Sequence, residues 1–130
     1  MATHKGSEGV VKVGANAVAE VTGFSVDETA DTIENTALSN SAHSYVSDLV
    51  GFSGTIDCMW DETDTTGQGA LTAGASVTLN LYPEGDGTTG DTYYTGTAIV
   101  TSISRANAIG SMVTATFSFQ GTNALTSATV

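Results

Sequence analysis

The chain has 130 residues, and its 40% share of hydrophobic residues is normal for a globular protein and too high for a disordered one. Fourteen Asp and Glu residues against three Lys and Arg give a formal net charge of -11, although only 13% of the residues are charged. Lys5, Lys12 and Arg105 are too few and too scattered to neutralise a nucleic-acid backbone. Tight binding to DNA is therefore excluded, and we expect the chain to repel it.

The length predicts one domain, residues 1–130, with a single core. The N-terminal arm Met1–Gly9 is polar, without the apolar stretch of a signal peptide, and no window approaches the roughly 18 apolar residues of a membrane span. The single cysteine, Cys58, can form no disulfide within the chain, and its apolar surroundings predict a small buried residue. These features predict a soluble cytoplasmic product.

Two predicted strands precede an irregular segment in the first half of the chain. Val10–Val13 is a short candidate, and Ala17–Val26 is a longer one. The apolar residues of the longer one change face at Gly23, which indicates a β-bulge. The chain then turns acidic from Asp27 to Glu34 and continues as a Ser/Asn/Ala-rich segment, Asn35–Asp48, without regular spacing. A small domain rarely keeps so long an irregular segment without a function.

The second half begins with the clearest alternation of apolar and polar residues, Phe52–Trp60, which predicts a strand. Asp64 or Thr65 is then the predicted N-cap of a short helix that ends near Gly74. About six strands, one short helix and no βαβ alternation predict a mainly antiparallel β-sandwich or half-barrel with one short flanking α-helix. The remaining predicted strands are Val77–Tyr82, Tyr93–Ser104 and Met112–Gln120, the last with Val113, Ala115, Phe117 and Phe119 facing the core.

No group of residues predicts catalysis. The acidic clusters Asp61–Asp64 and Glu84–Asp86 could supply oxygen ligands for calcium, but neither has the EF-hand spacing, and solvated turns are the simpler interpretation. His4 lies in the N-terminal arm and His43 in the irregular segment, so neither is placed for a catalytic triad. The sequence contains no glycine-rich phosphate loop and no paired cysteines for zinc. It therefore predicts no enzyme, no cofactor and no metal.

Two stretches of the sequence carry a resemblance to a known family. The first begins ADTIEN at Ala30, runs through a polar loop and a Gly-Thr-Ile strand that closes on Trp60, and ends VTLNLYP. The second is MVTATFSFQGTNALT from Met112. Together they resemble the major tail tube proteins of long-tailed, siphovirus-like bacteriophages and of gene transfer agents. The likeness covers roughly Val10–Leu125 and is one of pattern and order rather than of any catalytic motif.

Two positions depart from the family pattern. Many members have Pro-Gly-Leu before the third strand, where this chain has Asp48-Leu49-Val50-Gly51. A glycine often follows the final Gly-Thr, where this chain has Asn123. The first departure concerns the return of the loop, and the second concerns the path of the C-terminal tail.

The resemblance implies a structural subunit of a virion tail, made and assembled in the host cytoplasm. Six subunits form a ring, rings stack into a hollow tube, and DNA passes through without specific binding during ejection or transfer. Tape-measure and tail terminator or tip proteins are the other implied partners, and no membrane is involved. The tube protein of a contractile tail or secretion apparatus is one alternative, and an unrelated ligand-binding β-sandwich is another. A sandwich that binds carbohydrate would use exposed rings such as Tyr93 or Tyr94.

In this context we expect Asp27–Asp48 to form a hairpin-like arm and loop against neighbouring subunits, mobile in the monomer and ordered in the tube. Met1–Gly9 and Thr122–Val130 are further contact candidates. Six copies at -11 would give -66 per ring, which would let DNA slide without sticking. An alternative interpretation is that these acids only keep the tube soluble. The expected apolar anchors are Leu38, Tyr45, Val46 and Leu49, and the candidate lumen-facing acids, assigned to polar strand positions, are Glu20, Asp27, Asp57 and Asp61.

Overall fold

The computed structural model describes residues 5–130, so Met1–His4 of the expected N-terminal arm lie outside the described residues. Within them, the only helical segments are two 3-10 turns, η1 (Gly6–Glu8) and η2 (Gln68–Ala70). The mainly antiparallel β fold is confirmed. The strands are β1 (Val10–Val13), β2 (Asn16–Ala17), β3 (Val21–Glu34), β4 (Tyr45–Met59), β5 (Ser76–Tyr82), β6 (Thr92–Ala106), β7 (Thr114–Gly121) and β8 (Thr126–Thr129).

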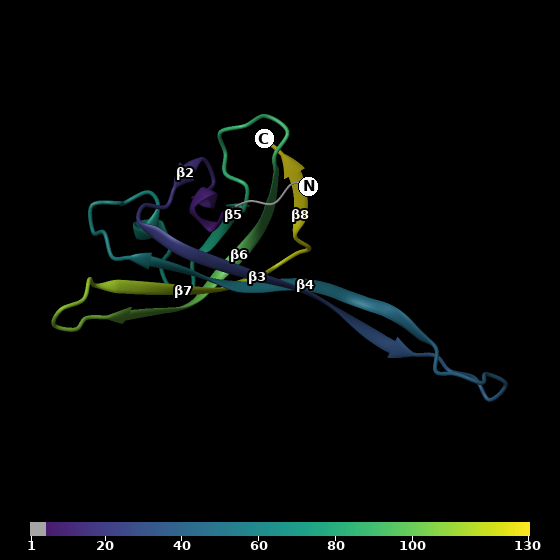
Figure 1. Cartoon of the computed structure of the whole chain (residues 1–130). Helices are drawn as coiled ribbons and strands as arrows, with labels where there is room; N and C mark the ends of the chain where they lie inside the picture. The colour runs from purple at the N-terminus through teal and green to yellow at the C-terminus, as the bar shows by residue number, and fades with distance from the viewer. Residues whose placement is uncertain (1–4) are drawn as a thin grey trace.

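All eight strands belong to one antiparallel sheet; seven of them follow the order β2-β1-β5-β6-β7-β4-β3, and β8 pairs with β6 outside this order. The first part of β6 pairs with β5 and β8, and its last part pairs with β7. The long strand β6 therefore joins two parts of the sheet. One is a curved part around β1 and β5, and the other is a long four-stranded part made of β6, β7, β4 and β3 (Figure 1). The curved part brings β1 close to β3, so the sheet forms a half-barrel.

The core lies inside this half-barrel. Leu79 and Leu81 of β5 belong to the same core cluster as Phe52 and Ile56 of β4, and all four are at most 1% exposed. The Phe52 ring fills the space above Gly96 and Gly121, where an added Cβ atom would collide with it. Three of the four residues expected to face the core from the last long strand, Ala115, Phe117 and Phe119, are buried, whereas Val113 precedes β7 and is half-buried.

Cys58 is a free, buried cysteine, as the sequence predicts. Burial, followed by the nearby charges of Asp57 and Asp64, raises the pKa of its thiol to about 11. The thiol donates to the Ala115 carbonyl at 3.6 Å. This cysteine is therefore a protonated core residue at neutral pH, and not a reactive thiolate.

The helix expected from Asp64 or Thr65 to Gly74 is not present, and the short turn η2 occupies its place. The Asp64 carboxylate accepts hydrogen bonds from the backbone N–H groups of Gly67 and Gln68 (3.1 and 3.0 Å). These bonds fix a tight turn, and the glycines disfavour a continuous helix. An added Cβ at Gly67 would collide with the carboxylate, so this glycine permits the close approach.

Side chains of this turn also tie it to distant backbone. Asp64 accepts a third bond from the Ala19 N–H at 2.8 Å. The buried side-chain amide of Gln68 donates to the carbonyls of Ala19 (2.8 Å) and Met59 (2.9 Å), and its oxygen accepts from the Asp61 N–H (3.0 Å). The segment after β4 therefore closes one end of the core through polar bonds that sequence periodicity does not reveal.

The β-bulge at Gly23 is confirmed, because the pairing of β3 with β4 shifts between Val21 and Gly23. The strand expected over Ala17–Val26 nevertheless starts later, at Val21. Glu20 adopts a positive φ of 57° in the turn that precedes it. That turn separates β2 from β3 and accounts for the difference.

The irregular segment is shorter than expected. Strand β3 continues through the acidic stretch to Glu34, and β4 begins at Tyr45 rather than near Phe52. Cross-strand pairs continue from Asp27 opposite Ser53 as far as Glu34 opposite Tyr45, with a second shift in register on the way. The prediction of irregular structure for the whole of Asn35–Asp48 is thus wrong, since only residues 35–44 connect the strands.

Candidate functional site

The distal half of the β3–β4 hairpin, residues 27–50, is called the arm here. It extends away from the rest of the molecule as a two-stranded ribbon (Figure 1). The outer edge of β3 pairs with no other strand among the described residues. An isolated two-stranded ribbon is marginally stable in water, so the arm is a segment that gains most from an additional partner.

The arm also carries most of the exposed large apolar side chains. Six of the nine found on the described residues belong to it, and Leu38 at its end is fully exposed. A concentration of this kind marks a surface that contacts another protein. The six are Ile33, Leu38, Tyr45, Val46, Leu49 and Val50.

All four anchors expected from the sequence lie on the arm. Leu38 belongs to the connection between the strands, and Tyr45, Val46 and Leu49 belong to β4, with Leu49 75% exposed. Ile33, which pairs with Val46, is an exposed apolar residue of the arm that is not among the predicted anchors. Its apolar side chain near the end of the acidic stretch is visible in the sequence. That it lies beside Val46 becomes clear only once the two strands are known to pair.

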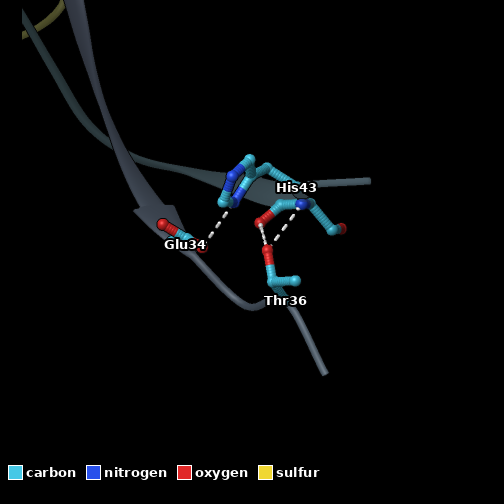
Figure 2. A network of polar contacts seen from close by, with 4 residues as sticks. Glu34, Thr36 and His43 are labelled. Carbon is cyan, nitrogen blue, oxygen red and sulfur yellow. Dashed lines mark hydrogen bonds and ion pairs between the residues drawn. The ribbon is translucent and has the colours of Figure 1, made fainter. Parts of the chain in front are cut away.

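A small polar network closes the end of the arm (Figure 2). Nδ1 of His43 lies 2.9 Å from a carboxylate oxygen of Glu34. The Thr36 hydroxyl accepts from the backbone N–H of Ser44 at 2.8 Å, and the Ser44 carbonyl accepts from the Asn35 N–H at 2.9 Å. The tip is therefore a closed turn with paired polar groups, and His43 is part of this turn rather than of a catalytic arrangement.

The face of the four-stranded part opposite the core is polar. Residues paired across an antiparallel sheet point to the same side, so the pairs starting from Asp27–Ser53 and Asp57–Thr116 define this face. The Asp57 carboxylate accepts from the Thr116 hydroxyl at 2.8 Å. We call this surface the polar face; its members are Ser25, Asp27, Ser53, Thr55, Asp57, Ser102, Ser104, Thr116, Ser118 and Gln120.

Only two of the four candidate lumen acids belong to it. Asp27 and Asp57 are exposed strand residues on the polar face. The assignment of Glu20 and Asp61 to strand positions is wrong: Glu20 lies in the turn before β3, and Asp61 follows the end of β4. The Asp61 carboxylate is used locally, because it accepts from the N–H (3.0 Å) and the hydroxyl (2.6 Å) of Thr63.

The acidic clusters considered for calcium have structural partners instead. In the loop after β5, Asp86 pairs with Lys12 at 2.8 Å, and Glu84 accepts from the Thr92 N–H at 3.0 Å. The ion pair lowers the pKa of Asp86 and raises that of Lys12. Among the described residues, no group of three or more His, Cys, Asp or Glu side chains is arranged to hold a metal ion. Nor does the described part of the chain contain a helix long and apolar enough to cross a membrane.

Charge is divided unevenly along the chain. All fourteen Asp and Glu residues lie between Glu8 and Asp91, and from Thr92 to Val130 the only charged side chain is Arg105. Arg105 is exposed near the end of β6, and its guanidinium lies 4.7 Å from the ring centre of Trp60. The arm is therefore acidic, whereas β6 and β7 are neutral or basic. The acids of the arm are Asp27, Glu28, Asp31, Glu34 and Asp48.

Comparison of this structure with solved structures gives full-length matches. A chain of the virion of a native gene transfer agent particle superposes with a TM-score of 0.77 at 14% identity, covering 97% of this chain and 99% of that one. A chain of the tail of an empty gene transfer agent particle with C6 symmetry gives 0.76 at 14% identity, with 95% and 98% covered. The tube-terminating cap of the anti-feeding prophage gives 0.75 at 13% identity, with 100% and 93% covered.

No family model and no curated protein sequence matches the chain. At 13–14% identity, the structural likeness concerns the fold. It spans the half-barrel and the arm together, since nearly the whole of each chain is superposed. The chain therefore has the phage tail tube-like fold that the resemblance in its sequence predicts.

Proposed function

We propose that this chain is the structural subunit of a tail tube, in which six copies form a ring and rings stack helically into a hollow tube that conducts DNA. The observation that carries the proposal is the arm: a paired ribbon with six exposed large apolar side chains, outside the core of its own subunit. The shared fold with chains of a gene transfer agent tail and of tube-containing complexes supports the same assignment. We assign no catalytic role to any residue.

The two free edges of the four-stranded part support the proposed ring. One is the outer edge of β3. The other is the end of β6 beyond Val100, because the pairing with β5 stops at Ser76 opposite Ile99. Neighbouring strands alternate in direction across β6, β7, β4 and β3, so β6 of the next copy would lie antiparallel to β3. Such pairing removes both edges, and six copies would close a barrel too wide for side chains to fill.

The charges favour the same arrangement. The β3 edge carries the acids of the arm, and the β6 edge carries Arg105 with no acid beside it. Opposite charges on the two edges guide head-to-tail pairing and oppose the pairing of two β3 edges. Each copy carries a net charge of -11, so copies repel one another. Contact between an acidic edge and an edge without acids reduces this repulsion.

In this ring the polar face would line the bore. It presents mainly Ser and Thr hydroxyls, and its charged members are Asp27 and Asp57. Hydroxyls keep the wall wetted, and the carboxylates repel phosphate, so DNA would pass without binding. Variants Asp27→Lys and Asp57→Lys should make assembled tubes retain DNA in a co-sedimentation assay, whereas the matched Asn variants should not. Equal retention by wild type and the Lys variants would contradict the lumen assignment.

The same fold supports a tube of a contractile apparatus, because a chain of an extracellular contractile injection system sheath-tube complex gives a TM-score of 0.71. A carbohydrate-binding sandwich is less well supported. The Tyr93 ring already stacks on Tyr82 with ring centres 4.6 Å apart, and Tyr94 packs against the core. Neither ring is a free platform for a sugar.

The proposed assembly is tested with the purified chain. Negative-stain microscopy and analytical ultracentrifugation should reveal rings or tubes that form with increasing concentration. The double variant Val46→Ser/Leu49→Ser should remain monomeric with an unchanged circular dichroism spectrum, because it alters exposed arm residues only. The control Ile99→Ser changes another exposed apolar residue, on the side of the sheet that bears the polar face, and should assemble like wild type. A wild-type chain that stays monomeric at every concentration would overturn the proposal.

A further inference from the structure

Two surface features remain outside the ring contacts proposed above. The first is the β6–β7 turn, residues 107–113, where Ile109 is fully exposed and Met112 is 66% exposed. The second, called the arm-root groove, has a volume of about 310 Å3 and lies where the arm leaves the body. Its lining residues are Glu28, Thr29, Ala30, Val50, Gly51, Ala124 and Leu125.

The local geometry of the turn fixes Ile109 in an exposed position. The Ser111 N–H donates to the Ala108 carbonyl at 3.2 Å, and Gly110 has a φ of 86°. These are the features of a type II β-turn, with Ile109 at its second position and glycine at the third. Turn corners are usually occupied by Pro, Asn, Asp or Ser, and nothing in the turn itself requires a large apolar side chain there. The turn therefore holds the isoleucine in an exposed position on a preformed backbone.

The turn lies at one end of the four-stranded part, and the segments of β3 and β4 that line the groove lie toward the other end, where the arm begins (Figure 1). Strands β6 and β7 run to the turn at one end, and β3 and β4 continue into the arm at the other. A subunit cannot bring its own turn to its own groove. A second copy displaced along the strand direction would bring its turn to the groove of the first. A heterologous contact between copies displaced along one direction does not close into a ring, so it generates a filament.

The chemistry of the two features is complementary. The turn sequence Asn-Ala-Ile-Gly-Ser-Met contains no charge and follows Arg105 directly through Ala106. The groove combines the apolar side chains of Val50 and Leu125 with the carboxylate of Glu28. Both copies have a strongly negative net charge, so a contact is most favourable where one of the two surfaces carries no acidic residue. The turn is such a surface, because it lies in the acid-free stretch from Thr92 onward.

We propose that Ile109 and Met112 of one copy insert into the arm-root groove of the copy in the adjacent ring, and that this contact stacks the rings. The contact rests on the proposed tube function and specifies its axial interface. It differs from the pairing of β3 with β6, which joins copies within one ring.

Cysteine pairs test the contact directly. In the double variant Ile109→Cys/Ala124→Cys, mild oxidation of assembled protein should link each copy to the next and give a ladder of covalent multimers on a non-reducing denaturing gel. The native Cys58 is buried and does not compete. The control Ile109→Cys/Thr88→Cys places the second thiol in the exposed loop after β5, away from the groove, and should give no ladder.

A second variant separates stacking from ring formation. Ile109→Asp should leave the circular dichroism spectrum and thermal unfolding unchanged, retain rings, and shorten tubes at least tenfold in electron micrographs, whereas Ile109→Val should retain normal tubes. Tubes of normal length in Ile109→Asp, or wild-type-like tubes of the Cys pair that yield no ladder, would overturn this contact and leave the tube function intact. A wild-type chain that forms neither rings nor tubes would overturn both.

Discussion

The body and the arm share the strands β3 and β4, yet apolar residues are buried in one region and exposed in the other. In the body, Phe52 and Ile56 of β4 are at most 1% exposed. A few residues earlier on the same strand, Val50 is 57% exposed and Leu49 is 75% exposed. Backbone pairing continues without interruption from one region to the other, apart from a bulge. Strand pairing and core burial are thus separable, and the hairpin extends beyond the region that a core of its own can cover.

This difference indicates where stability and function reside. Burial of large apolar side chains is the dominant favourable contribution to folding, and in this chain it is confined to the body. The arm gains backbone hydrogen bonds and little burial, so we expect it to open locally with a small free energy in the monomer. Assembly would supply the missing burial. The predictions below compare the two regions by substitution at matched positions.

The largest expected effect is in the body. Phe52→Ala removes the ring that fills the space above Gly96 and Gly121, and should lower the free energy of unfolding by about 3–5 kcal/mol in a urea titration. Val50→Ala lies two residues earlier on the same face of β4 and should cost less than about 0.5 kcal/mol, because its side chain is exposed. Similar losses for the two variants would show that the arm carries a core of its own.

An intermediate effect is expected where the body is closed by polar bonds. Burial raises the pKa of the Asp64 carboxyl, but the N–H groups of Ala19, Gln68 and Gly67 outweigh it and hold the pKa below the ordinary 3.8. Asp64→Asn should therefore lower the free energy of unfolding by about 1–2 kcal/mol at neutral pH, because both carboxylate oxygens accept N–H groups, and an amide has one acceptor oxygen and no charge. Asp27→Asn, at an exposed position on the arm, should cost less than about 0.5 kcal/mol under the same conditions.

The pH dependence gives a second measurement of the same carboxylate. A folded-state pKa below the unfolded one stabilises the protein above the unfolded value, and this stabilisation is lost as the pH falls through the folded value. The melting temperatures of wild type and Asp64→Asn should thus differ at pH 6 and converge as the pH falls below the ordinary value of 3.8. A difference that stays constant down to acid denaturation would mean that the carboxylate contributes through its shape and not through its charge.

Sequence periodicity predicts the body better than the arm, for a physical reason. Regular alternation predicts a strand where one face is buried: Phe52–Trp60 corresponds to the part of β4 that lies in the body, and Val77–Tyr82 corresponds closely to β5. On the arm both faces are exposed, so no burial selects an alternating pattern. Val46 and Leu49 are three positions apart, which breaks a regular alternation, and the register shift between Ala30 and Thr32 accommodates an extra residue of β4 at this place. The anchors were identifiable as apolar residues, but their place on a strand was not.

The segment after β4 was mispredicted for a different reason. Its N-cap signal was real, since Asp64 does accept hydrogen bonds from the following N–H groups. What periodicity could not reveal is that the same carboxylate, together with Gln68, also bonds to Ala19, which is more than forty residues away in the sequence. Such long-range polar contacts favour a single tight turn over a helix. The apolar corner at Ile109 likewise carries no strand or helix signal and stands out only once its exposure is known.

The smallest expected effect concerns the end of the arm. Glu34→Gln removes the charge that faces His43 in an exposed pair, and such pairs contribute about 0–1 kcal/mol, so global unfolding should be nearly unchanged. The local effect is measurable by hydrogen exchange, because opening of the tip exposes the N–H groups of Asn35 and Ser44, which are bonded within it. We expect these two amides to exchange roughly two- to fivefold faster in the variant, as a loss of about 0.5–1 kcal/mol implies. Amides of the body strands should be unaffected in the same sample.

In assembled tubes the difference between variant and wild type should disappear, because contacts with neighbouring copies would then hold the arm closed. A difference that persists after assembly would mean that the tip lies outside the subunit contacts.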